Sequence, residues 1–238
     1  MNNTEPEKKL QVLFEDNHLI AVNKLPGEIV QGDKTGDEPL TEKVKRYLKE
    51  KYNKPGEAFL GLAHRIDRPV SGVILFAKTS KSLARMNEMI RERQFKKTYW
   101  AVVKNKPKEE QATLTHYLER NEHMNKSFAY DQKKEGRQIA ELHYQVLAST
   151  NTYHLLEIDL ITGRHHQIRC QLAKIGCPIK GDLKYGAERS NKGGSIHLHA
   201  RKLEFIHPVK LNPVCITGKA PEDAVWNAAM EALMNKAK

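Results

Sequence analysis

Cysteine is scarce in this sequence, and the few cysteines follow no repeated spacing. Three occur in 238 residues, at Cys170, Cys177 and Cys215. An odd and sparse set argues against a disulfide framework and fits a reducing compartment. We therefore expect a fold that depends on its packed core rather than on disulfides.

Long hydrophobic runs are also missing. No apolar stretch is long enough to span a bilayer, and the opening MNNTEPEKKL lacks the apolar segment of a signal peptide. These absences predict a cytoplasmic protein with no membrane partner. With 39% hydrophobic and 29% charged residues, the composition is typical of a globular protein with a substantial core.

Acidic residues are outnumbered by basic ones. The chain has 40 Lys and Arg against 29 Asp and Glu, which gives a net charge of +11 and an isoelectric point near 9.4. Such an excess favours a polyanionic partner, of which nucleic acid is the commonest. The charge alone is also compatible with a solvated basic surface that binds nothing.

The first part of the chain predicts short strands and helices in turn. Residues 12–27 predict two short strands around a polar turn, ended by a Pro-Gly pair. Residues 37–52 predict a helix from the spacing of their apolar side chains, with Asp37 as its cap and Pro39 in its first turn. A buried strand, VILFA, and a helix that begins near Ser80 come next.

The hydrophobic period changes in the second part. IAELHYQVLAS and HLLEIDLIT alternate apolar and polar residues on either side of TNT, which predicts an antiparallel hairpin. HHQIRCQLAKIG predicts a short helix that ends at Gly176, and a last helix follows Pro221. Residues 104–111 predict a surface loop.

Strands and helices do not alternate regularly, so we predict an α+β fold around a mixed, largely antiparallel sheet with flanking helices. The sequence shows no internal repeat and no low-complexity linker. We therefore predict a polar tail over residues 1–11 and a single domain over residues 12–238.

Three segments concentrate polar residues beside apolar structure: HRID at 64–67, KTY at 97–99 and TGRHHQIR at 162–169. Taken singly, their members are ordinary. Asp67 fits a turn or capping acid, Arg169 a surface charge beside a helix, and Tyr99 a half-buried strand residue. The order and combination of the segments carry more information than any one residue.

Together the segments resemble the RluA family of RNA pseudouridine synthases. HRIDRPVSG is similar to the family's H-R-L-D-x-x-T-S-G, with Ile66 for Leu and Val70 for Thr. KKTYWAVV resembles K-x-Y-x-A-x-V, and ITGRHHQIR resembles G-R-x-H-Q-[IL]-R. FEDNHLIAVNKLPG, GDLKYGA and IHLHARKLEFIHPV extend the resemblance over most of the chain. Family members often carry an S4-type RNA-binding module, and we expect this chain to be the catalytic domain without it.

The resemblance implies a pseudouridine synthase fold with a basic cleft, in which specific uridines of ribosomal or transfer RNA are isomerised without cofactor or metal. It assigns Asp67 as the essential aspartate, as nucleophile or as electrostatic partner. A carboxylate in an apolar pocket tends to become neutral, and the resemblance pairs it with Arg169, which favours its charged form. Tyr99 is assigned to the target uracil. We favour a packing role for it, because an ordinary phenol is a poor base at neutral pH.

A uridine inside folded RNA has to be flipped out before it can react. The resemblance places four residues in contact with the RNA: Arg65, Arg164, His166 and Gln167. Arg65 is the candidate to fill the vacated place or to hold the flipped nucleotide's phosphate. Arg164 and a basic helix over residues 80–97 are expected to bind backbone phosphates, whereas Arg68 matches no motif position and is predicted to be a surface charge. We expect RNA as the partner of a monomeric protein.

Three other functions are compatible with parts of the sequence. A pure RNA-binding protein explains the charge but not an acid beside Ile66. A zinc protein has potential ligands in His197, His199, Cys170 and Cys177, but their H-x-H and C-x6-C spacings are not those of structural zinc sites. A glycosidase needs a second acid in a setting like that of Asp67, and the sequence shows no obvious one.

Overall fold

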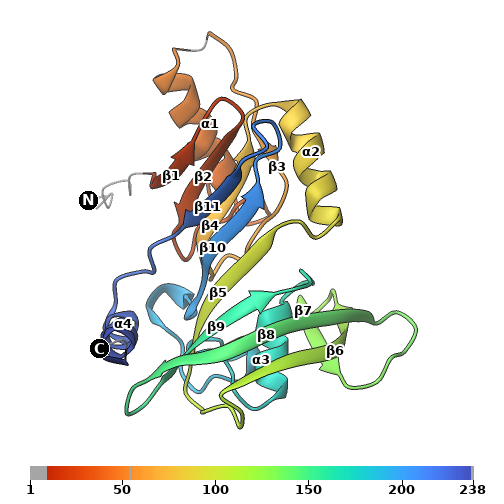
Figure 1. Cartoon of the computed structure of the whole chain (residues 1–238), viewed down its shortest axis with the longest axis vertical. Helices are drawn as coiled ribbons and strands as arrows, with labels where there is room; N and C mark the ends of the chain where they lie inside the picture. The colour runs from red at the N-terminus through yellow and green to blue at the C-terminus, as the bar shows by residue number, and fades with distance from the viewer. Residues whose placement is uncertain (1–9, 54, 237–238) are drawn as a thin grey trace.

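The protein was analysed as a computed structural model, which describes residues 10–53 and 55–236 (Figure 1). Most of the predicted polar tail, residues 1–11, lies outside the described residues. The strands are β1 (Val12–Glu15), β2 (Leu19–Lys24), β3 (Gly61–Leu62), β4 (Ser71–Ala77), β5 (Lys96–Val103), β6 (Gln111–Asn121), β7 (Lys126–Tyr130), β8 (Gln138–Ser149), β9 (His154–Leu160), β10 (Leu198–Ile206) and β11 (Pro213–Thr217). The helices are α1 (Leu40–Lys51), α2 (Ser80–Arg91), α3 (Gln167–Lys174) and α4 (Ala224–Lys236), with two short 3-10 helices, η1 (Leu183–Tyr185) and η2 (Lys192–Gly194).

The strands form one sheet in the order β1-β2-β4-β10-β5-β9-β8-β6-β7, with β3 beside β4 and β11 beside β10. All paired strands are antiparallel except β4 and β10. In Figure 1 the sheet runs from β1 and β2 at the top to β6 and β7 at the bottom, with helices beside both parts. The predicted α+β fold around a mixed, largely antiparallel sheet is confirmed.

Alternation along β2 gives the sheet two buried faces. Ile20 and Val22 belong to the cluster that includes the apolar residues of α1 and α3. Leu19 and Ala21 point to the other face, where they share a cluster with Met86 of α2. Helices α1 and α2 therefore cover opposite faces, and the strands between them are buried on both sides.

The helix predicted over 37–52 begins later than expected, at Leu40, with Pro39 as its N-cap. The predicted cap, Asp37, instead accepts a hydrogen bond from Arg68 Nη2 at 2.5 Å, because that guanidinium offers a stronger partner than a helix end. The side chain of Arg68 is 45% exposed, so its prediction as a surface charge is confirmed.

The helix predicted over 80–97 is shorter than expected. It ends at Arg91, Arg93 adopts a left-handed φ of 58°, and β5 follows shortly after. The physical reason is Phe95, which is buried and stacks on Phe205 with ring centroids 4.8 Å apart. Because the ring of Phe95 packs against Phe205 of the sheet, the helix ends before Lys96 and Lys97.

The hairpin predicted around TNT is confirmed as β8 and β9, with Leu142 opposite Leu160 and Ser149 opposite His154. Sequence patterns did not predict β6, β7 or β11, in which exposed and half-buried positions predominate. Of the two histidines that could serve as zinc ligands, His199 lies in β10 and His197 lies just before it.

Gly72 fixes the contact between β4 and β10, the parallel pair. Its φ is 121°, and a Cβ placed there would lie 2.5 Å from the backbone nitrogen of Ala200 and 2.8 Å from its carbonyl carbon. Beside it, the hydroxyl of Ser71 and Nδ1 of His199 are 2.9 Å apart. A residue without a side chain is therefore required where the segment from residue 63 to residue 70 enters the sheet.

Gly72→Ala is expected to lower the free energy of unfolding by at least about 3 kcal/mol, from backbone strain and overpacking together. Urea denaturation followed by circular dichroism measures this change. Gly32→Ala serves as the control, because a Cβ there meets no atom within 4 Å, and its effect should stay within about 0.5 kcal/mol. Equal stabilities for the two variants would contradict the close approach of β4 and β10.

Candidate active site

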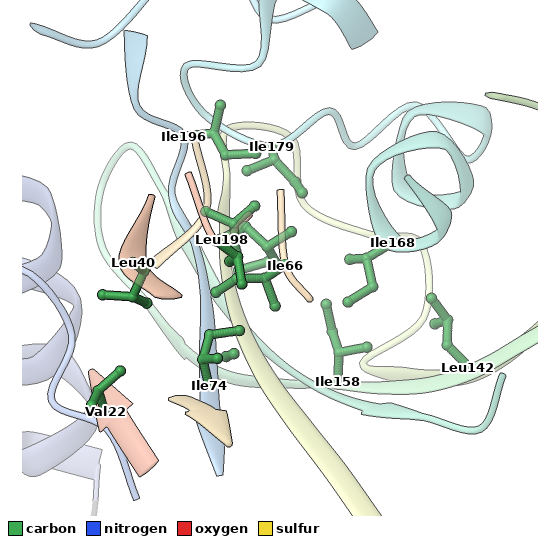
Figure 2. Close-up of a cluster of buried hydrophobic side chains, with 14 of the residues drawn as sticks. Val22, Leu40, Ile66, Ile74, Leu142, Ile158, Ile168, Ile179, Ile196 and Leu198 are labelled. Carbon is green, nitrogen blue, oxygen red and sulfur yellow. The ribbon is translucent and has the colours of Figure 1, made fainter. Parts of the chain in front are cut away.

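The segment between β3 and β4 carries Asp67 and is held by the core on both sides of it. Ile66 is 9% exposed and Val70 2%, and both belong to the main hydrophobic cluster. Figure 2 shows Ile66 in this cluster with Ile74 and Leu198. The backbone N–H of Val70 donates to the carbonyl of Asp67 at 3.0 Å and closes a tight turn. The chain thus buries the neighbours of Asp67 and leaves its carboxylate at the surface of the core.

Lys24 stabilises this turn through hydrogen bonds to backbone carbonyls. Its side chain is fully buried, and Nζ donates to three carbonyl oxygens, those of Leu25, Glu28 and Arg68, at 2.9, 2.7 and 3.0 Å. Burial lowers the pKa of Lys24 to about 7, against the charges of Glu28 and Asp67, which raise it. Three carbonyl acceptors require three N–H donors, a set that the ammonium form alone supplies. A positive charge therefore lies beneath the Asp67 turn.

Arg169 joins Asp67 to a second carboxylate. Its Nη1 donates to Asp67 Oδ2 at 3.0 Å, while Nε and Nη2 donate to the two oxygens of Asp182 at 2.7 and 2.8 Å. The side chain of Asp182 is 1% exposed, that of Arg169 6% and that of Asp67 31%. Burial by itself lowers the pKa of Arg169, but the hydrogen bonds and charge of Asp182, with those of Asp67, outweigh it and raise the pKa.

The two carboxylate oxygens of Asp67 differ in their contacts. Its Oδ2 accepts the hydrogen bond from Arg169 and lies 3.4 Å from His166 Nε2. Oδ1 has no hydrogen-bond partner among residues 10–53 and 55–236. The carboxylate is therefore anchored through one oxygen, and the other has no partner within the described residues.

His166 is the N-cap of α3, with a left-handed φ of 52°. Burial lowers its pKa to about 2, aided by the nearby charge of Arg169, so the imidazole is neutral at physiological pH. Its Nδ1 lies 3.0 Å from the hydroxyl of Tyr185, which also accepts a hydrogen bond from the backbone N–H of Ser127 at 2.9 Å. The same hydroxyl donates to the backbone carbonyl of Ser127 at 3.2 Å, so Tyr185 links the ring of His166 to β7. His166 thus lies beside Asp67 without adding a charge.

A cavity of about 280 Å³ opens between the Asp67 turn, β5 and the start of α3. All seven residues that the motifs assign to the site line it: Arg65, Asp67, Tyr99, Arg164, His166, Gln167 and Arg169. They come from three separate segments, which the fold brings together. The remaining walls are largely apolar, including Ile66, Ile90, Leu160 and Leu198.

Tyr99 forms one wall from β5. Burial raises the pKa of its phenol, and the charge of Asp67 raises it further. The hydroxyl makes no hydrogen bond within the described part of the chain, so it faces the cavity with its proton in place. These features favour packing against a planar ligand over proton abstraction in the free protein.

The four residues expected to bind RNA differ in exposure. The side chains of Arg65 and Arg164 are exposed, and the latter donates through Nε to the carbonyl of Ile139 at 3.2 Å. Gln167 is buried and its amide is engaged on both sides: Oε1 accepts from Thr162 Oγ1 and from the backbone of Arg164, and Nε2 donates to a backbone carbonyl. His166 is buried too. Gln167 and His166 therefore shape the cavity, and the two arginines reach its solvent side.

Sequence reasoning missed Asp182, Tyr185 and Lys24 as parts of the site. Asp182 and Tyr185 lie in GDLKYGA, and Lys24 lies in the opening segment that ends in NKLPG. In the sequence, Asp182 and Tyr185 could have been noticed as an acid and an aromatic residue in a turn bounded by glycines, and Lys24 as a lysine two residues after the apolar run LIAV. The potential zinc ligands, by contrast, are not brought together, and no group of three or more His, Cys, Asp or Glu in the described residues is arranged to hold a metal.

Comparison with known proteins gives first the class of this protein and then its family. Residues 18–174 match the family model described as RNA pseudouridylate synthase. The chain belongs to this family, as an RNA pseudouridine synthase of the RluA type. It is thus an isomerase that converts uridine in RNA to pseudouridine, which excludes the alternative of a protein that only binds RNA.

Individual relatives agree with this placement. The uncharacterized RNA pseudouridine synthase YhcT of Bacillus subtilis is 31% identical over 226 residues, which cover 90% of this chain and 70% of that one. The ribosomal large subunit pseudouridine synthase C of Buchnera aphidicola is 33% identical over 220 residues, which cover 90% and 67%. The tRNA pseudouridine synthase C of Vibrio cholerae is 31% identical over 239 residues, which cover 93% and 94%. The solved structure of human RNA pseudouridylate synthase domain containing 4 is 26% identical, with a TM-score of 0.77 over 94% of this chain and 93% of that one.

A half-buried histidine that lines the cavity predicts acid sensitivity. Nε2 of His64 accepts a hydrogen bond from the backbone of Leu75 at 3.1 Å, and burial lowers the pKa of His64 to about 3, with a further contribution from Lys97. The unfolded chain binds this proton near pH 6.5 and the folded chain does not. Stability is therefore complete above pH 6.5 and is lost as the pH falls toward 3.

In His64→Gln, an amide oxygen replaces the acceptor and nothing titrates. Between pH 6 and pH 4 the free energy of unfolding of this variant should fall less steeply than that of the wild type, by up to about 1.4 kcal/mol per pH unit. Urea denaturation across this range measures both slopes. Identical slopes would show that His64 is protonated in the folded protein.

Proposed function

We propose that this enzyme isomerises specific uridines of ribosomal or transfer RNA, with Asp67 as the essential residue. The observation that carries the proposal is the carboxylate of Asp67, held through Oδ2 by Arg169 and open through Oδ1, in a cavity lined by every residue that the motifs assign. The relatives named for ribosomal large subunit RNA and for tRNA support the two classes of substrate.

The reaction detaches uracil from the ribose, turns it, and rejoins it through carbon 5. The bond between C1′ and N1 breaks, a bond between C1′ and C5 forms, and the proton on C5 is lost while one is gained at nitrogen, so the mass is unchanged. Asp67 Oδ1 either attacks or stabilises the positive charge that develops as the base departs. Arg169 favours the carboxylate form that both alternatives require.

The other cavity residues receive complementary roles in this proposal. Tyr99 packs against the uracil ring, and Arg65 at the solvent side holds the flipped nucleotide or its phosphate. Arg164 binds the adjoining backbone, while His166 and Gln167 act through the shape of the site. No step requires a redox change or an external group, so we propose that no cofactor or metal takes part.

The seven residues that the motifs assign meet around one cavity within a single chain, so we propose that the enzyme acts as a monomer. No helix within the described ranges is long and apolar enough to cross a membrane. Because ribosomal and transfer RNA are its proposed substrates, we expect it to work in the cytoplasm.

Asp67→Asn tests the central role directly. The amide keeps the size of the side chain but loses the charge and most of the nucleophilicity, so isomerisation should fall below detection. Affinity for RNA should stay within about threefold, since the phosphate contacts come from other residues. The measurement is site-resolved pseudouridine mapping of total RNA from cells that lack the gene, after incubation with purified protein.

The matched control is Asp37→Asn, the same exchange at an exposed carboxylate outside the cavity, which should leave activity unchanged. Substantial pseudouridine formation by Asp67→Asn at neutral pH would rule out the proposed mechanism.

Metal removal offers a second test. Activity should survive exhaustive treatment with EDTA, provided that the RNA keeps its fold, because Asp67 is the one carboxylate among the cavity residues and a lone carboxylate is a poor site for a metal ion. Elemental analysis of the active protein and assay of the treated protein measure this. Stoichiometric zinc, lost together with activity, would contradict the proposal.

A further inference from the structure

A second cavity adjoins the proposed active site. Its volume is about 320 Å³, and it lies between the end of α2, the start of β5 and the segment that follows β9. Lys97 and Arg164 line both cavities, together with Ile90, Leu160 and Gly163. Two hollows that share a wall can hold two consecutive units of one bound strand.

The second cavity carries an unbalanced positive charge. Arg91, Arg93, Lys97 and Arg164 line it, and no acidic residue does. Within the described residues, Arg91, Arg93 and Lys97 form no ion pair or side-chain hydrogen bond. Elsewhere on the surface a cation such as Lys104 pairs with a carboxylate, that of Glu188. Four cations around one hollow repel one another, so their placement favours an anionic ligand.

The arrangement is fixed by the fold. Arg93 takes its left-handed conformation with its N–H bonded to the carbonyl of Ile90 at 3.1 Å, and the N–H of Gln94 donates to Met89 at 2.8 Å. The stacked ring of Phe95 then ties the segment to the sheet. The two arginines are thus presented by an anchored turn rather than by a free loop.

We propose that this second cavity binds the nucleotide next to the flipped uridine in the same RNA strand. Arg91 and Arg93 hold its phosphate, and Lys97 and Arg164 hold the phosphodiester that joins it to the uridine. The apolar parts of the wall, such as Ile161, interact with its sugar or base. This inference rests on the proposed function, since it presumes that a uridine occupies the first cavity.

Most of the polar groups that the second cavity offers to a ligand are charged. Apart from the four cations and Thr162, the residues that line it are apolar or glycine, and the hydroxyl of Thr162 already donates to Gln167. The site therefore binds the backbone of the neighbouring nucleotide and does not select among the bases that this nucleotide can carry.

The test is a binding assay with a fluorescein-labelled, single-stranded RNA decamer that contains one uridine among adenosines. Anisotropy is measured over a range of salt concentrations for the wild type, Arg91→Ala/Arg93→Ala and the control Lys49→Ala/Lys108→Ala, which removes two exposed charges outside both cavities. The arginine variant should bind about tenfold more weakly at low salt, and its log–log salt slope should be smaller by about 0.7 for each phosphate that is no longer neutralised. The control should change affinity less than twofold.

A second arm identifies the phosphate on the RNA and does not depend on the variant's folding. Decamers with a neutral methylphosphonate at one linkage near the uridine are compared with the unmodified strand. At one of the two linkages beside the uridine, or at the next one along, the methylphosphonate should weaken binding by the wild type about as much as the two arginine substitutions weaken binding of the unmodified strand. The same methylphosphonate should not weaken binding by the arginine variant any further. Equal drops in both proteins at every linkage, or no binding of the unmodified decamer by the wild type at low salt, would overturn the proposal.

These outcomes are separable from failure of the proposed function, because binding is measured without turnover. A wild type that makes no pseudouridine but shows the coupling would contradict the proposed function alone. A wild type that makes pseudouridine without the coupling would contradict the second cavity alone.

Discussion

Arg169 is buried between two carboxylates, and the geometry of the site depends on how that charge is compensated. Removing a guanidinium from water costs several kcal/mol, which a single partially exposed carboxylate such as Asp67 does not offset. Asp182 takes two of the N–H groups in a bidentate pair and is itself almost fully buried. One N–H direction then points at Asp67 Oδ2, and the orientation of the proposed catalytic carboxylate follows from the pair behind it.

The rest of the structure is arranged around this chain of three charges. Helix α3 is buried deeply enough to bring Arg169 to the cavity floor, and η1 supplies Tyr185 to its other side. The neighbouring imidazole of His166 is kept neutral by burial and by the guanidinium, so it lies beside Asp67 without adding a charge. In addition, Nζ of Lys24 donates to the carbonyl of Arg68 and so stabilises the turn that carries Asp67. Residues from four parts of the chain therefore position one carboxylate, either directly or through a neighbouring residue.

Much of this could be predicted from the sequence because the signals are local. The alternation in β8 and β9 and the apolar spacing in α1 predicted those elements directly, and the seven residues that the ordered motifs assign all line one cavity. What escaped prediction depends on contacts distant in sequence. Asp182 resembles an ordinary turn acid until the fold places it against Arg169. Strands β6 and β7 expose much of their surface, so they lack a strong hydrophobic pattern, and the end of α2 was set by the tertiary packing of Phe95.

We expect Asp182 to act on the reaction through Arg169 and Asp67 rather than independently. A double-mutant cycle on the single-turnover rate of pseudouridine formation tests it, with Arg169→Lys, which keeps the charge but loses the planar fork, and Asp182→Asn. Each change alone should slow the reaction by about a hundredfold or more, and the double variant should be within about fivefold of the slower single variant. Effects that multiply in the double variant would show that the two residues act independently, and would contradict the account.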